Sequence, residues 1–466
     1  MLLQRGDRAN LDIEKFADQG KGLARVDGLV VFVEGAVPGD RVRAEVTARK
    51  SSYAEARIEE LLSASEYRTA PRCRYFPTCG GCQWQQADYD AQVAYKRRSV
   101  KETLEHQGGF SGVSVRPALA AEEPYYYRNR MDFTFSDRRW LTPREKETGE
   151  DFDMRFALGL HPPGEGRRVL DLKECHLQSP LSARLVNGVR NFARERGWPA
   201  QSNGSGYLRR LTIRQPTRTD HLMVHLLTRS DQPGRTDALA AFLQNEFPEV
   251  TTFVSTAYGG KLSAIRAGGT TRVHFGPGTV REKMGAFTFE IGPHDFFQPN
   301  TAQAERLYRA ARDVAEPAPD DTVYDLYCGL GALSLFLAEE AGRVVGVEDD
   351  TAMTKKARRH AETHDLGNAA FASGAVGEVL TPAFAEEHGA PDVVVADPPR
   401  AGMREAVTER IARLQPRRLV YVSCNPQTQA HDLKRFAGEY AIDAVQPVDQ
   451  FPQTHHIENV VALGRV

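Results

Sequence analysis

The sequence predicts an α/β protein in three parts: a small β-barrel, a mainly β or α+β middle part, and a C-terminal parallel sheet. After residue 300, short apolar runs alternate with helical segments, which is typical of a parallel sheet with helices on both faces. Residues 1–62 alternate in short β-like runs broken by glycine and aspartate turns, which favours a barrel. The length of 466 residues suits roughly three domains of ~150 residues each.

The N-terminal runs include Leu29–Val33 and Arg41–Val46, with a turn at Pro38–Asp40. This pattern fits an OB-like barrel that binds oligonucleotides on its open face, and it fits any other small all-β packing module equally well. Residues 87–107 predict an amphipathic helix whose Lys96–Arg98 triplet we expect in solvent. Strand-like runs then follow at Met131–Phe135, Phe156–Leu160, Leu208–Ile213, Leu222–Leu227, Phe287–Ile291, Val323–Tyr327, Val344–Glu348, Val393–Asp397 and Leu419–Ser423.

The composition excludes several classes of protein. With 41% hydrophobic and 26% charged residues, the chain is not collagen-like, mucin-like or largely disordered. It has no run of ~20 apolar residues and no signal-peptide pattern, so we expect a cytoplasmic protein with no membrane partner. The net charge of −2 argues against a strongly basic coat protein. That charge divides into +6 over residues 1–300 and −8 over residues 301–466, and the basic part suits contact with RNA.

Four of the six cysteines have the spacing of a metal site. Cys73, Cys79 and Cys82 lie within ten residues, and Cys175 is the only other cysteine before the C-terminal part. In a reducing compartment, metal and catalytic roles are commoner than disulfides. Three close thiols and one distant thiol suit a [4Fe-4S] cluster. Zinc is the alternative, since it usually takes two close pairs of ligands and the second pair would need a histidine such as His176.

A glycine turn and a later acid predict a nucleotide-like cofactor site. Asp325–Gly331 ends a strand and opens a helix, and Glu348 closes the next strand, where its carboxylate can accept hydrogen bonds from ribose hydroxyls. A dinucleotide site would have a third glycine where this chain has Ser334, and no Walker loop is present. S-adenosylmethionine has a ribose but no pyrophosphate, so it is the favoured ligand.

Two further strands end in residues that carry chemistry. Asp397 and Cys424 follow the third and fourth strands of the predicted sheet, so they should face the same crevice as Gly329 and Glu348. A thiolate that adds to carbon 6 of a uracil makes carbon 5 reactive toward a methyl sulfonium. A general base must then remove the proton on carbon 5. Glu458 is the candidate base, with His455 and His456 as rivals.

Taken in order, these motifs resemble the RNA (uracil-5-)-methyltransferase family, and most of all its 23S ribosomal RNA members with a TRAM domain and an iron-sulfur cluster. The resemblance covers nearly the whole chain. It rests on a TRAM-like stretch, the four cysteines, Phe296–Asn300, Asp325–Gly331, Asp397–Gly402, Ser423–Pro426 and His456–Glu458.

The resemblance implies a role for each matching residue. Cys424 corresponds to the nucleophile and Glu458 to the base. The residues that it implies for the methyl-donor and uracil pocket are Gln298, Tyr327, Gly329, Gly331, Glu348 and Asp397. At Ala332 and Ala375, where relatives can carry polar side chains, cofactor contacts could only be apolar or through the backbone.

The implied domains are a TRAM-like barrel (1–62), a central iron-sulfur and RNA-binding domain (67–84 and 118–292), and a Rossmann-like methyltransferase domain (85–117 and 293–466). The implied partner is RNA, with 23S rRNA favoured and tRNA as the alternative, and we expect a monomer. Tyr125–Arg130 and Arg209–Arg210 are candidate RNA contacts, because they combine stacking rings with cations. A non-catalytic iron-sulfur protein that binds RNA is the alternative from another class.

Overall fold

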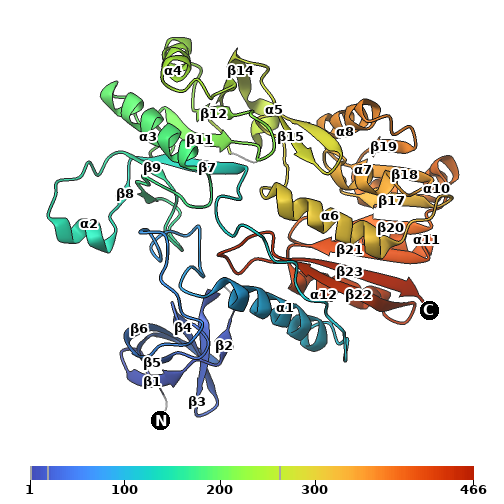
Figure 1. Cartoon of the computed structure of the whole chain (residues 1–466), viewed down its shortest axis with the longest axis horizontal. Helices are drawn as coiled ribbons and strands as arrows, with labels where there is room; N and C mark the ends of the chain where they lie inside the picture. The colour runs from blue at the N-terminus through green and yellow to red at the C-terminus, as the bar shows by residue number, and fades with distance from the viewer. Residues whose placement is uncertain (1–2, 18–19, 262–263) are drawn as a thin grey trace.

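The structure is a computed structural model that describes residues 3–17, 20–261 and 264–466. It has three parts, each built on its own sheet, and the long helix α1 (Tyr89–His106) lies between the N-terminal sheet and the C-terminal part (Figure 1). The N-terminal sheet lies at one end of the molecule. The central sheet and the C-terminal sheet lie side by side at the other (Figure 1). This arrangement agrees with the three parts predicted from the sequence.

The N-terminal part is a six-stranded sheet in the order β1-β5-β6-β4-β3-β2. Alternate residues of its longer strands point into one apolar core; Val42, Ala44 and Val46 are examples from a single strand. This alternation is the pattern that predicted a barrel-like module. The strands are β1 (Arg8–Asp12), β2 (Lys15–Phe16), β3 (Gly22–Val26), β4 (Leu29–Glu34), β5 (Arg41–Arg49) and β6 (Tyr53–Ser63).

Helix α1 packs against the C-terminal part, and one expectation about it is wrong. Val100 and Leu104 are buried in the C-terminal core, as the amphipathic pattern predicted. Lys96 was expected in solvent, but its side chain is only 1% exposed and its Nζ lies 2.6 Å from Oδ1 of Asp449. A lysine can be buried when a carboxylate pairs with it, and no local pattern reveals a partner so distant in the chain.

The central part is a six-stranded, mostly antiparallel sheet in the order β14-β13-β12-β11-β7-β9. Helices α3 and α4 lie on one face of it (Figure 1) and share an apolar core with residues such as Phe133 and Leu211. The elements are β7 (Arg130–Ser136), β8 (Arg139–Trp140), α2 (Pro143–Thr148), β9 (Ala157–Gly159), β10 (Val169–Leu170), α3 (Pro180–Glu195), β11 (Leu208–Arg214), β12 (Met223–Thr228), α4 (Pro233–Glu246), β13 (Thr252–Ala257), α5 (Ile265–Gly268) and β14 (Thr270–Phe275).

The hairpin of β15 (Val280–Met284) and β16 (Phe287–Ile291) belongs to the C-terminal core. Its Phe287 ring packs edge-on against Phe336 of helix α7, with 5.4 Å between the ring centroids. Its buried residues join the cluster that covers one face of the C-terminal sheet. The boundary expected at residue 292 therefore separates the hairpin from the residues with which it packs.

The C-terminal part is a seven-stranded sheet in the order β19-β18-β17-β20-β21-β23-β22. The first five strands are parallel, as predicted, and helices cover both faces. Strands β23 and β22 are antiparallel, which the sequence analysis did not predict. The strands are β17 (Thr322–Leu326), β18 (Arg343–Glu348), β19 (Ala369–Ser373), β20 (Val393–Ala396), β21 (Arg418–Ser423), β22 (Tyr440–Val448) and β23 (Glu458–Arg465).

The helices of the C-terminal part divide between the two faces of the sheet. Residues of α6, α7 and α8 join one core, and residues of α1, α9, α11 and α12 join the other. The helices are α6 (Thr301–Ala315), α7 (Ala332–Ala338), α8 (Thr351–Thr363), α9 (Val376–Val379), α10 (Pro382–His388), α11 (Glu405–Leu414) and α12 (Pro426–Leu433), followed by the 3-10 helix η3 (Lys434–Phe436).

Candidate active site

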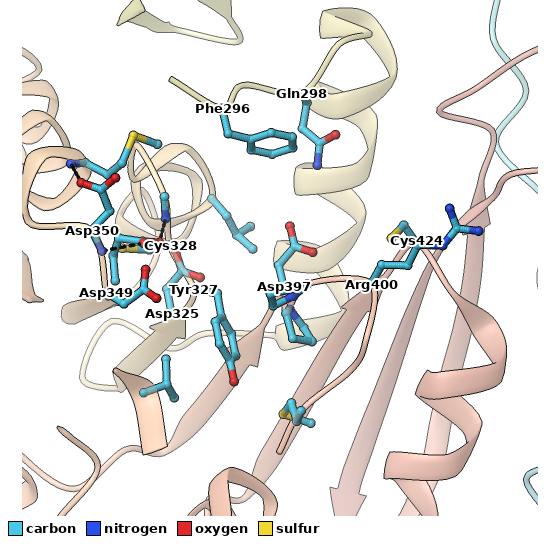
Figure 2. A pocket seen from close by; sticks show the side chains of 18 of the residues that line it. Phe296, Gln298, Asp325, Tyr327, Cys328, Asp349, Asp350, Asp397, Arg400 and Cys424 are labelled. Carbon is cyan, nitrogen blue, oxygen red and sulfur yellow. Dashed lines mark hydrogen bonds between the residues drawn. The ribbon is translucent and has the colours of Figure 1, made fainter. Parts of the chain in front are cut away.

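A cavity of about 1480 Å³ lies at the carboxyl ends of the parallel strands. Ligands bind at this edge in open α/β sheets, because the loops that follow the strands converge there. Most of the predicted site residues line the cavity: Gln298, Tyr327, Gly329, Glu348, Asp397, Cys424 and Glu458. Figure 2 shows Asp397 between the glycine turn and Cys424, with Phe296 and Gln298 facing them.

The glycine turn holds Glu348 by its backbone. The N–H of Gly329 donates to Oε2 of Glu348 (3.0 Å), and the N–H of Asp350 donates to Oε1 (3.0 Å). Burial and the neighbouring Asp349 raise the pKa of Glu348 to about 7. This carboxylate is therefore fixed at the end of β18, where a ribose can reach it.

Gly331 shapes the turn that opens α7, and its predicted ligand contact stays a prediction. It is absent from the cavity lining, and its φ of 80° places it in the left-handed region at the start of α7. A Cβ there would lie 3.0 Å from Ala357 and from Phe371. Gly331 therefore serves the turn and its packing. Ala332 and Ala375 do line the cavity, where they present apolar surface.

Of three carboxyl groups in the cavity, those of Asp325 and Glu458 are buried and that of Asp397 is half-buried. Burial raises the pKa of Asp397 to about 7. Burial raises the pKa of Asp325 to about 7 as well, with Asp397 and Glu348 adding to the effect. Burial and Asp397 also raise the pKa of Glu458 well above its ordinary value. Side chains in such surroundings readily exchange protons near neutral pH.

The Cys424 thiol lies between opposing charges. Burial, Glu458 and Asp397 raise its pKa to about 11, while Arg400 acts in the opposite direction. Figure 2 shows the Arg400 side chain extending past Cys424. The thiol is therefore protonated at neutral pH before any ligand changes this balance.

Among the candidate bases, the geometry favours Glu458. Both Glu458 and His456 line the cavity, whereas His455 is not among the lining residues. Burial and the cations around His456, including Arg400 and Arg128, lower its pKa to about 3. An imidazole with so low a pKa is a weak base, whereas a carboxylate with a raised pKa is a stronger one.

Several lining residues had no assigned role in the sequence analysis. They include Phe296, whose ring is 64% exposed at the cavity, and the buried Tyr308. Gln450 supports Gln298 by donating its amide to Oε1 (3.2 Å). The signal for Phe296 was present, because it opens the Phe296–Asn300 motif.

The loop that leads to Glu458 is held from outside the cavity. Lys96 donates to the carbonyl of Phe451 (3.1 Å), and the Tyr127 hydroxyl donates to that of Pro452 (3.1 Å). The backbone N–H groups of Gln83 and Trp84 both donate to the carbonyl of Gln453 (2.9 and 3.1 Å). Residues next to Cys82 thus contact the loop that precedes Glu458 directly.

The four predicted metal-ligand cysteines line one small second pocket of about 20 Å³. Burial, together with Cys175 and Cys73, raises the pKa of Cys82 to about 12. Burial also raises the pKa of Cys79, Cys73 and Cys175. Within residues 3–17, 20–261 and 264–466, no group of three or more His, Cys, Asp or Glu side chains is arranged to hold a metal ion. The donor set fits a sulfur-bound group, and the cluster and zinc stay predictions.

The candidate RNA contacts have other partners within the protein. Tyr126 and Arg72 form a surface group, with the guanidinium 4.9 Å from the ring centroid, whereas Tyr127 is buried. Arg209 donates to the carbonyl of Tyr258 (2.6 Å), and Arg210 lies 3.8 Å from Asp132.

No helix in the described part of the chain is long and apolar enough to cross a membrane.

Known proteins match the chain along almost its whole length. The family model for tRNA (uracil-5-)-methyltransferase matches residues 272–466, and that for the TRAM domain matches residues 3–58. An RNA methyltransferase of Bacteroides thetaiotaomicron is 38% identical over 96% of this chain and 99% of its own length. One from Chlorobaculum tepidum is 39% identical over 99% of this chain and 97% of its own.

A solved structure shows the same architecture. The tRNA (uracil-54, C5)-methyltransferase of Pyrococcus abyssi, in complex with S-adenosyl-L-homocysteine, is 25% identical with a TM-score of 0.75. The match covers 98% of this chain and 100% of that one. The cavity at the sheet edge, the Glu348 turn and these relatives agree: the chain belongs to the RNA (uracil-5-)-methyltransferase family and is an S-adenosylmethionine-dependent enzyme.

Proposed function

We propose that the protein methylates carbon 5 of a specific uridine in 23S rRNA through a covalent adduct of Cys424. The observation that carries this proposal is that Cys424, Asp397 and Glu458 line one cavity together with the Glu348 turn. A thiol, a buried acid and a base with a raised pKa are the groups that this chemistry needs. S-adenosylmethionine supplies the methyl group and would lie against Tyr327, Gly329 and Glu348.

The reaction begins when the Cys424 thiol gives its proton to a carboxylate of the cavity such as Asp397, and the resulting thiolate sulfur bonds to carbon 6 of the uracil. The electron pair of the 5,6 double bond then makes carbon 5 nucleophilic, and carbon 5 bonds to the methyl group as the sulfonium–methyl bond breaks. Glu458 accepts the proton from carbon 5, the carbon–sulfur bond to Cys424 breaks, and the double bond is restored. Arg400 favours the thiolate at both ends of the cycle, since it lowers the pKa of Cys424.

A uridine inside folded RNA reaches Cys424 only after it leaves its stack. Phe296, exposed at the cavity beside Gln298, offers a ring against which a displaced base can pack. A tRNA substrate is the second candidate, because the Pyrococcus abyssi enzyme, a tRNA methyltransferase by name, matches this chain over 98% of its length.

The test is an adduct assay with RNA fragments that contain 5-fluorouridine. Fluorine on carbon 5 cannot leave as a proton, so wild-type protein should remain bound to the RNA after methyl transfer. Cys424→Ala should form no adduct, and Cys328→Ala, which removes the other thiol of the C-terminal part, should still form one. Fragments of 23S rRNA and of tRNA distinguish the two substrates, and no adduct with either RNA would contradict the thiol mechanism.

We also propose that Cys73, Cys79, Cys82 and Cys175 hold a [4Fe-4S] cluster, with zinc as the alternative occupant. The support is that the four thiols line one pocket and that burial raises their pKa values, so that a positive metal centre would stabilise them as thiolates. Protein prepared without oxygen should contain iron and absorb in the visible range. Zinc without iron would contradict the cluster, and Cys175→Ser should lose the metal.

A further inference from the structure

Arg128 faces the catalytic cavity from the central part of the molecule. Its backbone is fixed on two sides, because its N–H donates to the carbonyl of Leu177 (2.9 Å) and the residue forms a β-bridge with Asn300. Its guanidinium lies 5.8 Å from the ring centroids of Tyr127 and of Phe451. The side chain lines the same cavity as Cys424 and is therefore held in place before any substrate arrives.

Arg128 has no acidic partner among the residues that the structure describes. The groups that act on its charge are Tyr127, with which its side chain also forms a hydrogen bond, Cys175 and Cys82, and none of them is a carboxylate. Its Nε is buried and makes no hydrogen bond within the described part of the chain. A buried guanidinium donor without an acceptor is costly, so it points to an anion that is supplied from outside the protein.

Arg128 and Arg400 both bring positive charge to the cavity. Arg128 and Arg400 both act on His456, whose pKa burial and neighbouring cations lower to about 3. Asp325, Asp397 and Glu458 line the same cavity. Acidic side chains of the cavity can therefore attract the cation of a methyl donor, and its guanidinium groups can bind an anion.

We propose that Arg128 binds a backbone phosphate next to the target uridine. This inference rests on the proposed function, since an RNA with a displaced uridine brings its flanking phosphates to the mouth of the cavity. A guanidinium matches a phosphate with two parallel N–H groups, which fixes orientation as well as charge. Arg128 would thereby fix the position of the uridine over Cys424 without contacting the reacting atoms.

The four-cysteine pocket is the other place where the charge of Arg128 could act. Cys82 and Cys175 act on that charge, yet Arg128 lines the catalytic cavity and is absent from the lining of the cysteine pocket. The catalytic cavity is therefore the favoured location of its anion, and the experiment includes a measurement that separates the two.

The test compares Arg128→Gln and Arg128→Lys with a matched control, Arg235→Gln. Arg235 also packs on two rings, at 4.8 Å from Tyr207 and 5.9 Å from Trp198, but it is absent from the cavity lining. RNA binding is measured over a range of salt concentrations. Each RNA fragment is also prepared with an uncharged methylphosphonate at either phosphate beside the target uridine.

Arg128→Gln should weaken RNA binding about 10- to 100-fold and reduce the slope of log affinity against log salt by about 0.7, the value for one lost phosphate contact. Arg128→Lys should lose less, because it keeps the charge without the two-pronged geometry. One methylphosphonate should weaken binding by wild-type protein and leave binding by Arg128→Gln unchanged. Arg235→Gln should behave as wild type.

An unchanged salt slope in Arg128→Gln, or equal methylphosphonate effects in wild type and variant, would overturn the proposal. Loss of metal from Arg128→Gln with an unchanged slope would also overturn it, by assigning the residue to the cysteine pocket. These binding measurements do not need turnover. They therefore stand apart from the adduct assay, whose failure in wild type would contradict the proposed function itself.

Discussion

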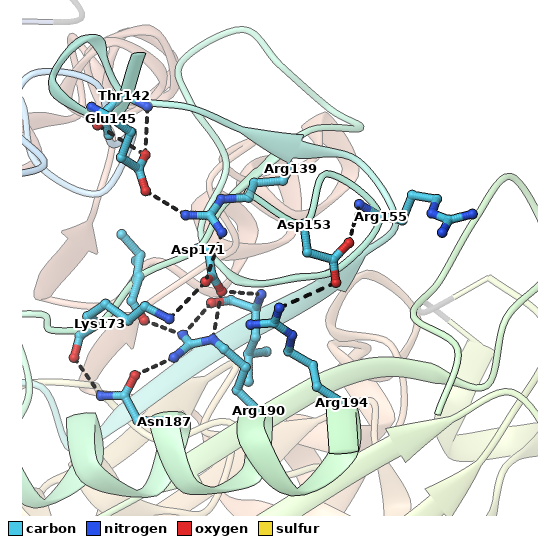
Figure 3. Close-up of polar contacts among 12 residues, drawn as sticks. Arg139, Thr142, Glu145, Asp153, Arg155, Asp171, Lys173, Asn187, Arg190 and Arg194 are labelled. Atoms are coloured by element: carbon cyan, nitrogen blue, oxygen red, sulfur yellow. Dashed lines mark hydrogen bonds and ion pairs between the residues drawn. The ribbon is translucent and has the colours of Figure 1, made fainter. Parts of the chain in front are cut away.

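Carboxyl groups in two regions of this molecule have opposite surroundings: those in one region are paired with cations, and those in the other lie beside further acids. In the central part, Asp171 lies among cations (Figure 3): its Oδ1 is 2.6 Å from Nε of Arg190, and its Oδ2 is 3.0 Å from Nζ of Lys173. In the catalytic cavity, Asp325, Asp397 and Glu458 lie mainly beside one another.

The pKa values follow this difference. Burial alone would raise the pKa of Asp171, but Arg190 and Lys173 more than offset it and lower the pKa. For Asp325 and Asp397, burial prevails and raises the pKa to about 7. A paired buried charge ties elements of the fold together, whereas an unpaired buried acid destabilises the protein until a substrate makes use of it.

Among variants that test this difference, Glu458→Gln should have the largest effect, and that effect should be on turnover. Loss of the base should lower turnover by about 10²- to 10⁴-fold. The thiol can still attack and the methyl group can still transfer, so an adduct with ordinary uridine RNA should accumulate, visible as a denaturant-resistant complex. The free energy of unfolding should not fall, because the carboxyl group has no cation to lose. A marked loss of stability would contradict this expectation, because it would show that Glu458 stabilises the fold as the paired Asp171 does.

Asp171→Ala should have the next largest effect, now on stability. It leaves Arg190, whose side chain is 1% exposed, without its carboxylate, and breaking a buried pair costs about 3–5 kcal/mol. Chemical denaturation measures the loss. Protein that is still folded should form the 5-fluorouridine adduct. A loss of less than about 1 kcal/mol would show that the pair acts like a surface pair.

Acidity should affect the two regions in opposite directions. Asp325 and Asp397 have folded pKa values of about 7, above the ordinary value of 3.8, so their contribution to stability is full below about pH 4 and is lost as pH rises to about 7. Asp171 has a lowered pKa, so its contribution is present above its ordinary pKa and is lost as pH falls through the folded value.

Unfolding of Asp325→Asn at several pH values tests this contrast. The fall in unfolding free energy between pH 4 and 7 should be smaller in the variant than in wild type. Asp171→Asn should instead flatten the loss of stability at acid pH. If both variants changed the same pH range, the two regions would not differ as described.

The smallest effect concerns ligand charge. S-adenosylmethionine carries a sulfonium charge that S-adenosylhomocysteine lacks, so deprotonation of the cavity acids should favour the first ligand over the second. Calorimetry at pH 6 and pH 8 should show the affinity ratio rising by up to about tenfold, since one proton is linked. If the ratio of the two affinities did not change with pH, the charges of these acids would not act on the bound sulfonium.

The sequence predicted the residues that line the cavity better than it predicted the partners of the residues around it, such as Lys96. Strand ends identify Glu348, Asp397 and Cys424 because parallel strands bring their carboxyl ends to one edge. For Gly331 the sequence does not separate a role in the turn and its packing, which the structure shows, from a contact with a ligand, because both have the same local sequence. Lys96 was misplaced because its partner lies 353 residues away. That no described residue places a carboxylate beside Arg128 can be seen only in three dimensions.

The ion pair of Lys96 and Asp449 also affects which fragments of this chain can keep the site intact. The match to the methyltransferase family model begins at residue 272, yet the side chain of Asp449 is 0% exposed and its cation comes from α1. A fragment cut at that boundary would keep every catalytic side chain and lose the lysine beneath the loop that precedes Glu458. We therefore expect a separable methyltransferase unit to need helix α1 as well as residues 272–466.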